Sequence, residues 1–407
     1  MRVLLIGSGG REHALAWKLS QSPRLTELHA APGNPGIAQL GECHPVRAED
    51  AEGLLDLAHS VDADLVVVGP EAPLVAGVAD ELRHAGIAVF GPGKEAARIE
   101  GSKSFAKEVM RAAGVPTAET MSEARAPCVV KADGLAAGKG VFVCQNRDEL
   151  DAALREVARL GDTWLVEELL EGDEVSAFAL ASGVQTTVLP TAQDYKRAFD
   201  GDEGPNTGGM GAYSPVVGLD ESAGTEELID TIHLPVLREL AARGTPFVGV
   251  LFAGMMLTDA GPKVLEFNCR LGDPEAQVLL PRLEGDLLGA MAGAAAGDAA
   301  SPTLAVSDQA AVTVVIAAAD YPARGDSGTP IEGIEDAESE GALVFQAGTA
   351  MHKGRVVTNG GRVLGVTGLG PSVEEARERA YEACGRISFE GMRFRRDIAA
   401  RAVNVAT

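Results

Sequence analysis

The sequence has few aromatic residues, no long hydrophobic run and no cysteine pair at metal-binding spacing. Aromatic residues make up 4% of the 407 residues. No apolar run reaches the ~18 to 20 residues that a membrane-spanning helix needs. The N-terminus, MRVLLIGSGGREH, lacks the apolar core and cleavage site of a signal peptide and is typical of a first strand. We therefore expect a cytoplasmic protein without membrane partners.

Cysteine and histidine patterns argue against a disulfide framework and a zinc motif. The five cysteines show no C-x-x-C spacing and are odd in number, which predicts reduced, mostly buried thiols. The seven histidines are scattered along the chain, without a pair at the spacing of a metal motif. The sequence therefore predicts no zinc site.

Positive charge is also scarce, since the formal net charge is -24. Such a chain repels a polyanion at long range, so we expect no nucleic-acid partner. Any lysine or arginine that binds a small anion must attract it at short range, against the negative electrostatic potential of the whole chain.

Length and pattern predict about three domains at ~100 to 200 residues each. In residues 1–100, β-rich runs at 2–6, 65–68 and 87–90 alternate with helical patterns at 12–21, 50–59 and 76–85, which predicts a parallel α/β sheet. The dinucleotide fingerprint fails, because Glu12 stands where its third glycine belongs and no acid follows the second strand.

Three loops follow successive strands of this predicted sheet: GSGGRE, APGN and GPEAPL. Each loop alone is more simply explained as a turn. Together at the carboxyl edge of one parallel sheet they favour a substrate site. The candidate residues in these loops are Gly9, Gly10, Arg11, Glu12, Gly33, Asn34, Gly69, Pro70 and Glu71.

The segment VVKADGLAAGKGVFV (129–143) has a glycine-rich loop with a lysine but is not a Walker loop. Gly134 is one residue too close to the Gly-Lys pair, Gly140 replaces the hydroxyl residue, and a strand follows in place of a helix. We predict a hairpin flap over phosphates, with Lys139 at its tip. Lys131, inside an apolar run, contacts an anion or forms a structural salt bridge; the sequence favours neither.

The segment KVLEFNCR (263–270) predicts a magnesium site. In a strand, Glu266 and Asn268 point the same way and Arg270 continues the row. A carboxylate and an amide oxygen are ligands that suit magnesium carrying nucleotide phosphates. The alternative is the polar face of an edge strand.

Other segments give weaker predictions. Residues 192–215 form the longest stretch with little secondary-structure signal, which favours a binding loop. Helices are predicted near 222–243 and over 276–296, and another begins at the capping box Ser372-x-x-Glu375. Asn359-Gly360 between two β-runs predicts a hairpin, with a ligand contact by Arg362 left open.

Taken together, these segments resemble the ATP-grasp family and, within it, the phosphoribosylamine-glycine ligases. PNTGGMGAYSP (205–215) and EFNCRLGDPE (266–275) are the most specific motifs, and the resemblance spans essentially the whole chain. It implies ligation of glycine to 5-phosphoribosylamine with ATP, through glycyl phosphate, in purine biosynthesis. It also implies a Rossmann-like domain at 1–100, an ATP-grasp domain at 101–306 whose two antiparallel sheets clamp ATP (lid about 116–180), and a β-rich domain with a helix at 307–407.

The resemblance assigns roles to individual residues. Phosphates would be bound by Lys103 and Lys131 and covered by Gly134, Gly138, Lys139 and Gly140. The adenine would meet Glu167, Glu168 and Leu170, and the ribose Glu174. Magnesium or manganese would be bound by Glu266 and Asn268, and Arg270 would stabilise the transferring phosphoryl group. From the chemistry of the second step, our own hypothesis is that Asp194 accepts or orients the amine protons. The substrate site would also include Asp194, Lys196, Asn206, Thr207, Gly208, Gly209, Met210 and Asp273.

The chain departs from the family pattern at four places, one of which is a short spacer before CVVKADG. Ser8 replaces a common Asn, Tyr195 replaces a common His, and the strand LFAGMML lacks an acid that many relatives carry. Two other functions stay open: another ATP-grasp ligase or carboxylase, and a nucleotide-binding regulatory module. We expect a monomer or weak homo-oligomer.

Overall fold

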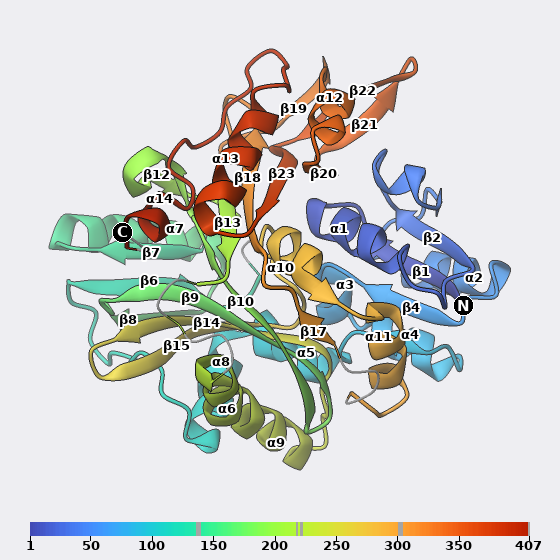
Figure 1. The fold of residues 1–407 in the computed structure, drawn as a ribbon. Coiled ribbons are helices and arrows are strands. Elements are labelled where there is room, and N and C mark those ends of the chain that lie inside the picture. Colours follow the sequence, from blue (N-terminus) through green and yellow to red (C-terminus); the bar gives the residue numbers. More distant parts are fainter. Residues whose placement is uncertain (136–139, 217–218, 220–222, 300–303, 406–407) are drawn as a thin grey trace.

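The computed structural model describes residues 1–135, 140–216, 219, 223–299 and 304–405. An N-terminal α/β unit lies at one side of the molecule, a small lid sheet lies at the other, and a long antiparallel sheet runs between them (Figure 1). No described helix is long and apolar enough to cross a bilayer.

The N-terminal unit is a five-stranded parallel sheet in the order β3-β2-β1-β4-β5. Val3 and Leu5 pack into one hydrophobic cluster while Leu4 and Ile6 pack into another, so the run VLLI is buried on both faces. The predicted parallel α/β layout is confirmed. Its elements are β1 (Arg2–Gly7), α1 (Gly10–Leu19), β2 (Glu27–Pro32), β3 (Glu42–Cys43), α2 (Ala51–Ser60), β4 (Leu65–Val68), α3 (Glu71–Ala76), α4 (Val78–His84) and β5 (Val89–Phe90).

The long sheet has eight strands in the order β15-β14-β9-β10-β13-β18-β23-β20, and each neighbouring pair is antiparallel. β13 pairs with β18, so this sheet runs through the domain boundary predicted near residue 306. The strands are β9 (Asp173–Ser182), β10 (Gln185–Asp194), β13 (Gly211–Ser214), β14 (Val248–Thr258), β15 (Gly261–Asn268), β18 (Ala310–Ala317), β20 (Leu343–Gln346) and β23 (Arg362–Gly370).

The lid is a separate sheet with its own small core. β6 (Cys128–Ala132) pairs with β7 (Val141–Cys144) on one side and with β8 (Trp164–Glu168) on the other, both antiparallel. Helix α7 (Arg147–Leu160) packs on this sheet through residues such as Leu150 and Val157. The predicted hairpin is therefore confirmed, although residues 136–139 at its tip, including Gly138 and Lys139, lie outside the described residues.

Helices around the long sheet correct one prediction. The helix predicted over 276–296 is two helices, because the backbone becomes extended at Leu283, with ψ 133°, and turns at Gly285, whose φ is +95°. Asp286 then caps the second by accepting from the Gly289 amide at 3.1 Å. The helices are α5 (Lys94–Gly101), α6 (Lys103–Ala113), α8 (Ala223–Leu228), a π-helix (Ile229–His233), α9 (Leu234–Ala242), α10 (Ala276–Arg282) and α11 (Leu287–Ala295); a short pair, β16 (Leu283–Glu284) and β17 (Ala305–Val306), accompanies them.

The C-terminal part corrects a second prediction. The chain does not form a hairpin at Asn359-Gly360, because β22 (Arg355–Gly360) pairs with β19 (Asp326–Pro330) and β21 (Thr349–His352), whereas β23 belongs to the long sheet. At this crossing a Cβ on Gly361 would lie 2.4 Å from the Tyr321 ring. The remaining helices are α12 (Ile334–Ser339), α13 (Val373–Cys384), which Ser372 caps as predicted, and α14 (Ala400–Val405).

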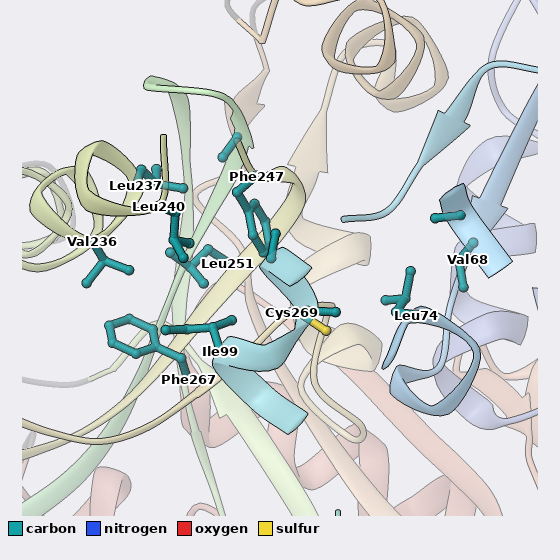
Figure 2. Packing of buried hydrophobic residues seen from close by; sticks show 14 of the residues in the cluster. Val68, Leu74, Ile99, Val236, Leu237, Leu240, Phe247, Leu251, Phe267 and Cys269 are labelled. Atoms are coloured by element: carbon teal, nitrogen blue, oxygen red, sulfur yellow. The ribbon is translucent and has the colours of Figure 1, made fainter. Parts of the chain in front are cut away.

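One hydrophobic core joins the N-terminal unit to the long sheet (Figure 2). Val68 and Leu74 come from the N-terminal unit, and Leu237 comes from α9. Phe267 on β15 packs into the same core and is 2% exposed. Because side chains alternate along a strand, its burial turns Glu266 and Asn268 to the opposite face.

Candidate active site

A cavity of about 840 Å³ lies where the lid, the long sheet and the N-terminal unit meet. This volume is in the range of small-molecule sites, about 300 to 1,000 Å³. Its walls carry charged side chains of both signs from segments far apart in the sequence. The lining residues that were predicted from the sequence are Arg11, Glu71, Lys103, Lys131, Gly134, Gly140, Glu167, Glu168, Leu170, Glu174, Asp194, Lys196, Asn206, Thr207, Gly208, Glu266, Asn268, Arg270 and Asp273.

Two lysines share one buried carboxylate at the base of the lid. Glu167 on β8 is 1% exposed. It pairs with Lys131 at 2.8 Å and with Lys107 at 3.0 Å. Lys131 also donates to the Leu265 carbonyl at 3.0 Å. The salt-bridge interpretation of Lys131 is therefore confirmed, and because Lys131 also lies on the cavity wall, its contact with a ligand anion stays a prediction.

Lys107 was missed by the sequence analysis. It stands four residues after Lys103 on α6, and both ammonium groups reach the cavity. Burial lowers the pKa of Lys107, although Glu167 acts against this shift. The spacing of the two lysines on one helix face was the available signal. Lys103 itself donates to the Gly134 carbonyl at 3.1 Å, which ties α6 to the start of the lid loop.

Glu266 and Asn268 carry oxygens suited to a divalent cation. Both line the cavity on β15. In the described part of the chain, the Glu266 carboxylate has no hydrogen-bond or ion-pair partner. Burial would raise the pKa of Glu266, but Lys196, Lys131 and Lys103 together lower it, so it is ionised at neutral pH. As predicted from LFAGMML, β14 adds no acid; it contributes Phe252 and Met256.

Arg270 is held between two acids. Its guanidinium contacts Glu100 at 2.6 Å and Glu71 at 3.1 Å, and it also donates to the Asn268 amide oxygen at 3.1 Å. Burial would raise the pKa of Glu71, but Arg270 and Arg11 lower it to about 2. Glu100 lies at the end of α5 and was not predicted, because only the tertiary fold brings it to residue 270.

Asp194 lies in a crowded acidic corner of the cavity. Burial, reinforced by the neighbouring Glu275 and Glu174, raises the pKa of Asp194 to about 8, although Lys196 opposes the shift. Lys196 forms an ion pair with Glu174. Burial also raises the pKa of Glu275, which lines the cavity and follows EFNCRLGDP at once. A carboxyl group that titrates near neutral pH is suited to proton transfer.

The segment 192–215 is more ordered than predicted. β11 (Arg197–Phe199) and β12 (Glu203–Asn206) pair within it, and β10 and β13 frame them. Tyr195, which stands where the family commonly has His, is buried, lines the cavity and lies under the Arg395 guanidinium at 4.8 Å. The Tyr195 phenol ring therefore forms the cavity wall beside Arg395, at the position where the family commonly has an imidazole.

Several predicted substrate residues are not part of the cavity lining: Gly9, Gly10, Glu12, Gly33, Asn34, Gly69, Pro70, Gly209 and Met210. Their contacts are those of a scaffold. The Glu12 carboxylate accepts from the Gly9 amide at 2.6 Å and from Arg11 at 2.7 Å. The Asn34 amide donates to the Ser8 carbonyl and accepts from the Ile37 amide. These bonds fix the first two loops beside Arg11.

Comparison with known proteins agrees with this architecture. The family models for the N domain, the ATP-grasp (A) domain and the C domain of phosphoribosylglycinamide synthetase match residues 1–100, 101–276 and 311–401. The phosphoribosylamine-glycine ligase of Streptomyces coelicolor is 51% identical, with 99% of each chain covered. The ligase of Caldanaerobacter subterraneus is 44% identical, with 98% of this chain and 100% of the relative covered.

Solved structures extend the comparison. The crystal structure of phosphoribosylamine-glycine ligase from Thermotoga maritima superposes with a TM-score of 0.84 at 35% identity, covering 98% of this chain and 100% of that one. A biotin carboxylase domain of Hydrogenobacter thermophilus was solved with magnesium ADP and bicarbonate. It superposes with a TM-score of 0.70 at 19% identity, covering 96% of this chain and 91% of that one. This similarity shows the shared fold alone. The predicted family and fold class are confirmed: this chain belongs to the phosphoribosylamine-glycine ligases of the ATP-grasp family.

Proposed function

We propose that the cavity joins glycine to 5-phosphoribosylamine in two steps, through glycyl phosphate, with ATP converted to ADP and phosphate. This proposal rests on three lysines and a pair of metal-binding oxygens that line one cavity. Lys131 comes from the lid and Lys103 and Lys107 come from α6, while Glu266, without a hydrogen-bond or ion-pair partner among the described residues, stands beside Asn268 on β15. A triphosphate needs both cationic contacts and a metal-binding oxygen pair.

ATP would enter between the lid and the long sheet. Lys103 and Lys131 would bind its phosphates, and Gly134 and Gly140 would lie over them. The Glu167 carboxylate is already used by Lys107 and Lys131, so the adenine edge would meet the chain at 168–170. Glu174 would accept hydrogen bonds from the ribose hydroxyls after its ion pair with Lys196 loosens.

The donor set fits magnesium, or manganese in its place. Glu266 and Asn268 supply two hard oxygens, and the carboxylate is ionised and free of protein partners among the described residues. When bound, the cation would neutralise charge on the phosphate oxygens.

Glycine is activated before it meets the amine. Its carboxylate is ionised at neutral pH, so attack on the terminal phosphate needs no general base. Arg270, held rigidly by Glu71 and Glu100, would stabilise charge on the transferring phosphoryl group. The acyl phosphate then has a good leaving group, which the carboxylate itself lacks.

The amine of phosphoribosylamine would attack the acyl carbon, and phosphate would leave. Asp194 would accept the proton that the amine loses, for which a pKa near 8 is suited. The sugar phosphate would lie toward Arg11 and Asp273 on the N-terminal side. Lys196, Asn206, Thr207 and Gly208 would complete this end of the cavity.

Measuring ADP release with each substrate omitted in turn tests the overall reaction. We expect release to require glycine, and other amino acids to be poor replacements. Hydroxylamine in place of phosphoribosylamine should trap glycine hydroxamate from the acyl phosphate. ADP release that ignores glycine but requires bicarbonate would overturn the proposal in favour of a carboxylase, and absence of any ADP release would favour a regulatory module. A cytoplasmic location and a monomeric or weakly associated state remain predictions.

A further inference from the structure

We propose that His29, Glu42 and His44 form a binding site for a divalent transition metal of the zinc class, separate from the active site. His29 lies on β2, Glu42 lies on the edge strand β3, and His44 follows β3 directly. One ligand atom from each of the three lies within 4.8 Å of those from the other two. None of these residues lines the active-site cavity.

The ligand atoms are arranged like those of a metal site. His29 Nδ1 and His44 Nε2 are hydrogen-bonded at 3.1 Å, and this separation is also close to that of two nitrogens that bind one tetrahedral cation at about 2.0 to 2.1 Å each. Glu42 Oε2 is 3.9 Å from the same His29 nitrogen. Two imidazoles and one carboxylate would leave a fourth position open to water.

His29 has a second feature of a metal ligand. It is 7% exposed, and its other ring nitrogen, Nε2, has no hydrogen-bond partner among the described residues. The Glu27 carboxylate stands 3.5 Å from this nitrogen. Metal-bound imidazoles commonly direct their second nitrogen at a carboxylate, which fixes the ring. Glu27 would draw closer and take that role once Nδ1 is bound to the cation.

The position of the site suggests its consequence. β3 has only two residues, and it pairs with β2 through His29–Glu42 and Ala30–Cys43. A bound cation would link the first of these register partners and so fasten the edge strand. We therefore expect zinc to raise the thermal stability of the protein without being needed for catalysis.

This site could not be predicted from the spacing of its residues in the sequence. The two histidines are separated by fourteen residues, which is not the spacing of a known zinc motif. The proposal departs from the expectation of no zinc site, which rested on spacing in the sequence alone. Parallel strand pairing brings them together.

Titration of the chelator-treated protein with zinc chloride alone tests the proposal. Calorimetry should show one equivalent bound, and His44→Ala and Glu42→Gln should each weaken binding by at least about 10-fold, the smallest loss expected even for an outer-shell partner. Both residues are half-buried or exposed, so these variants should fold. His84→Ala, at an exposed histidine of the same domain, is the matched control and should bind like the wild type.

Two further measurements separate this site from the active site and from nonspecific binding. Glu266→Ala should retain the zinc equivalent, and cobalt in place of zinc should give visible d–d bands that His44→Ala abolishes. The proposal would be overturned if the wild type bound no stoichiometric zinc. It would also fail if His84→Ala weakened binding as much as His44→Ala does, or if Glu266→Ala removed the equivalent.

Discussion

Lys131 and Glu167 form an ion pair across two neighbouring strands of the lid, with 2.8 Å between Nζ and Oε2. Lys107 reaches the same carboxylate from α6. The acid thus joins the lid to α6 and supplies the counter-charge for two buried lysines. Its removal should affect folding as well as nucleotide binding.

Glu167→Gln should therefore lower the free energy of unfolding by about 3 kcal/mol, because it leaves two buried ammonium groups without their counter-charge. Urea denaturation measures this loss. Glu168→Gln is the matched control. The Glu168 side chain is 36% exposed and pairs with Lys263, so its loss should cost at most about 1 kcal/mol. Similar losses in both variants would show that the Glu167 pairs contribute little.

Glu266→Ala should reduce ADP release by about 100-fold or more at fixed magnesium, since it removes the carboxylate proposed to bind the cation. The free energy of unfolding should change far less than activity does, because Glu266 has no hydrogen-bond or ion-pair partner among the described residues and loses only its attraction to nearby lysines. Activity and urea denaturation should be measured on the same preparation, with the exposed Glu284→Ala as control. Equal loss of stability and activity would make Glu266 a structural residue.

Asp194→Asn should slow the complete reaction by about 100-fold or more, as expected for loss of a general base. In the wild type the rate should rise as pH increases through about 8, where Asp194 loses its proton. The variant should lose this rise, yet still form glycine hydroxamate with hydroxylamine, because activation of glycine needs no base. An unchanged pH–rate profile would exclude the role.

The same substitution should change the pH dependence of stability. Burial raises the pKa of Asp194 from 3.8 to about 8. Between pH 3.8 and 8, the folded state therefore keeps a proton that the unfolded state has lost. The contribution of this group to stability is complete below pH 3.8 and is lost as pH rises through 8. Asp194→Asn should therefore be more stable than the wild type at pH 8 to 9, as thermal unfolding would show.

Gly172→Ala should destabilise the fold by about 2 kcal/mol or more, because Gly172 has φ +148° and an added Cβ would lie 2.1 Å from the Leu257 carbonyl oxygen. Gly183→Ala is the control. It also has positive φ, at +60°, but its Cβ would meet no atom within 4 Å. Its cost should be about 1 kcal/mol, that of backbone strain alone. Equal melting temperatures for the two variants would contradict the close contact at Gly172.

Strands and helices were predicted correctly from the sequence where neighbouring residues determine them. The apolar run of β1, the hairpin around residues 129–143 and the cap at Ser372 each follow from neighbouring residues. Alternation along KVLEFNCR also predicted correctly that Glu266 and Asn268 share a face. The helix predicted over 276–296 was wrong because the chain turns at Gly285. The hairpin predicted at Asn359 was wrong because β22 and β23 belong to different sheets, which only the tertiary structure shows.

The sequence by itself determined the family, the parallel and antiparallel sheets, and most of the charged residues that line the cavity, since motifs and alternation are local properties. Only the tertiary structure decided which charges meet. It brought Glu100 to Arg270, set Lys107 beside Glu167, crowded acids around Asp194, and placed His29 against His44. Ion pairing and pKa depend on distance through space and on burial. Both are fixed by packing between segments far apart in the chain.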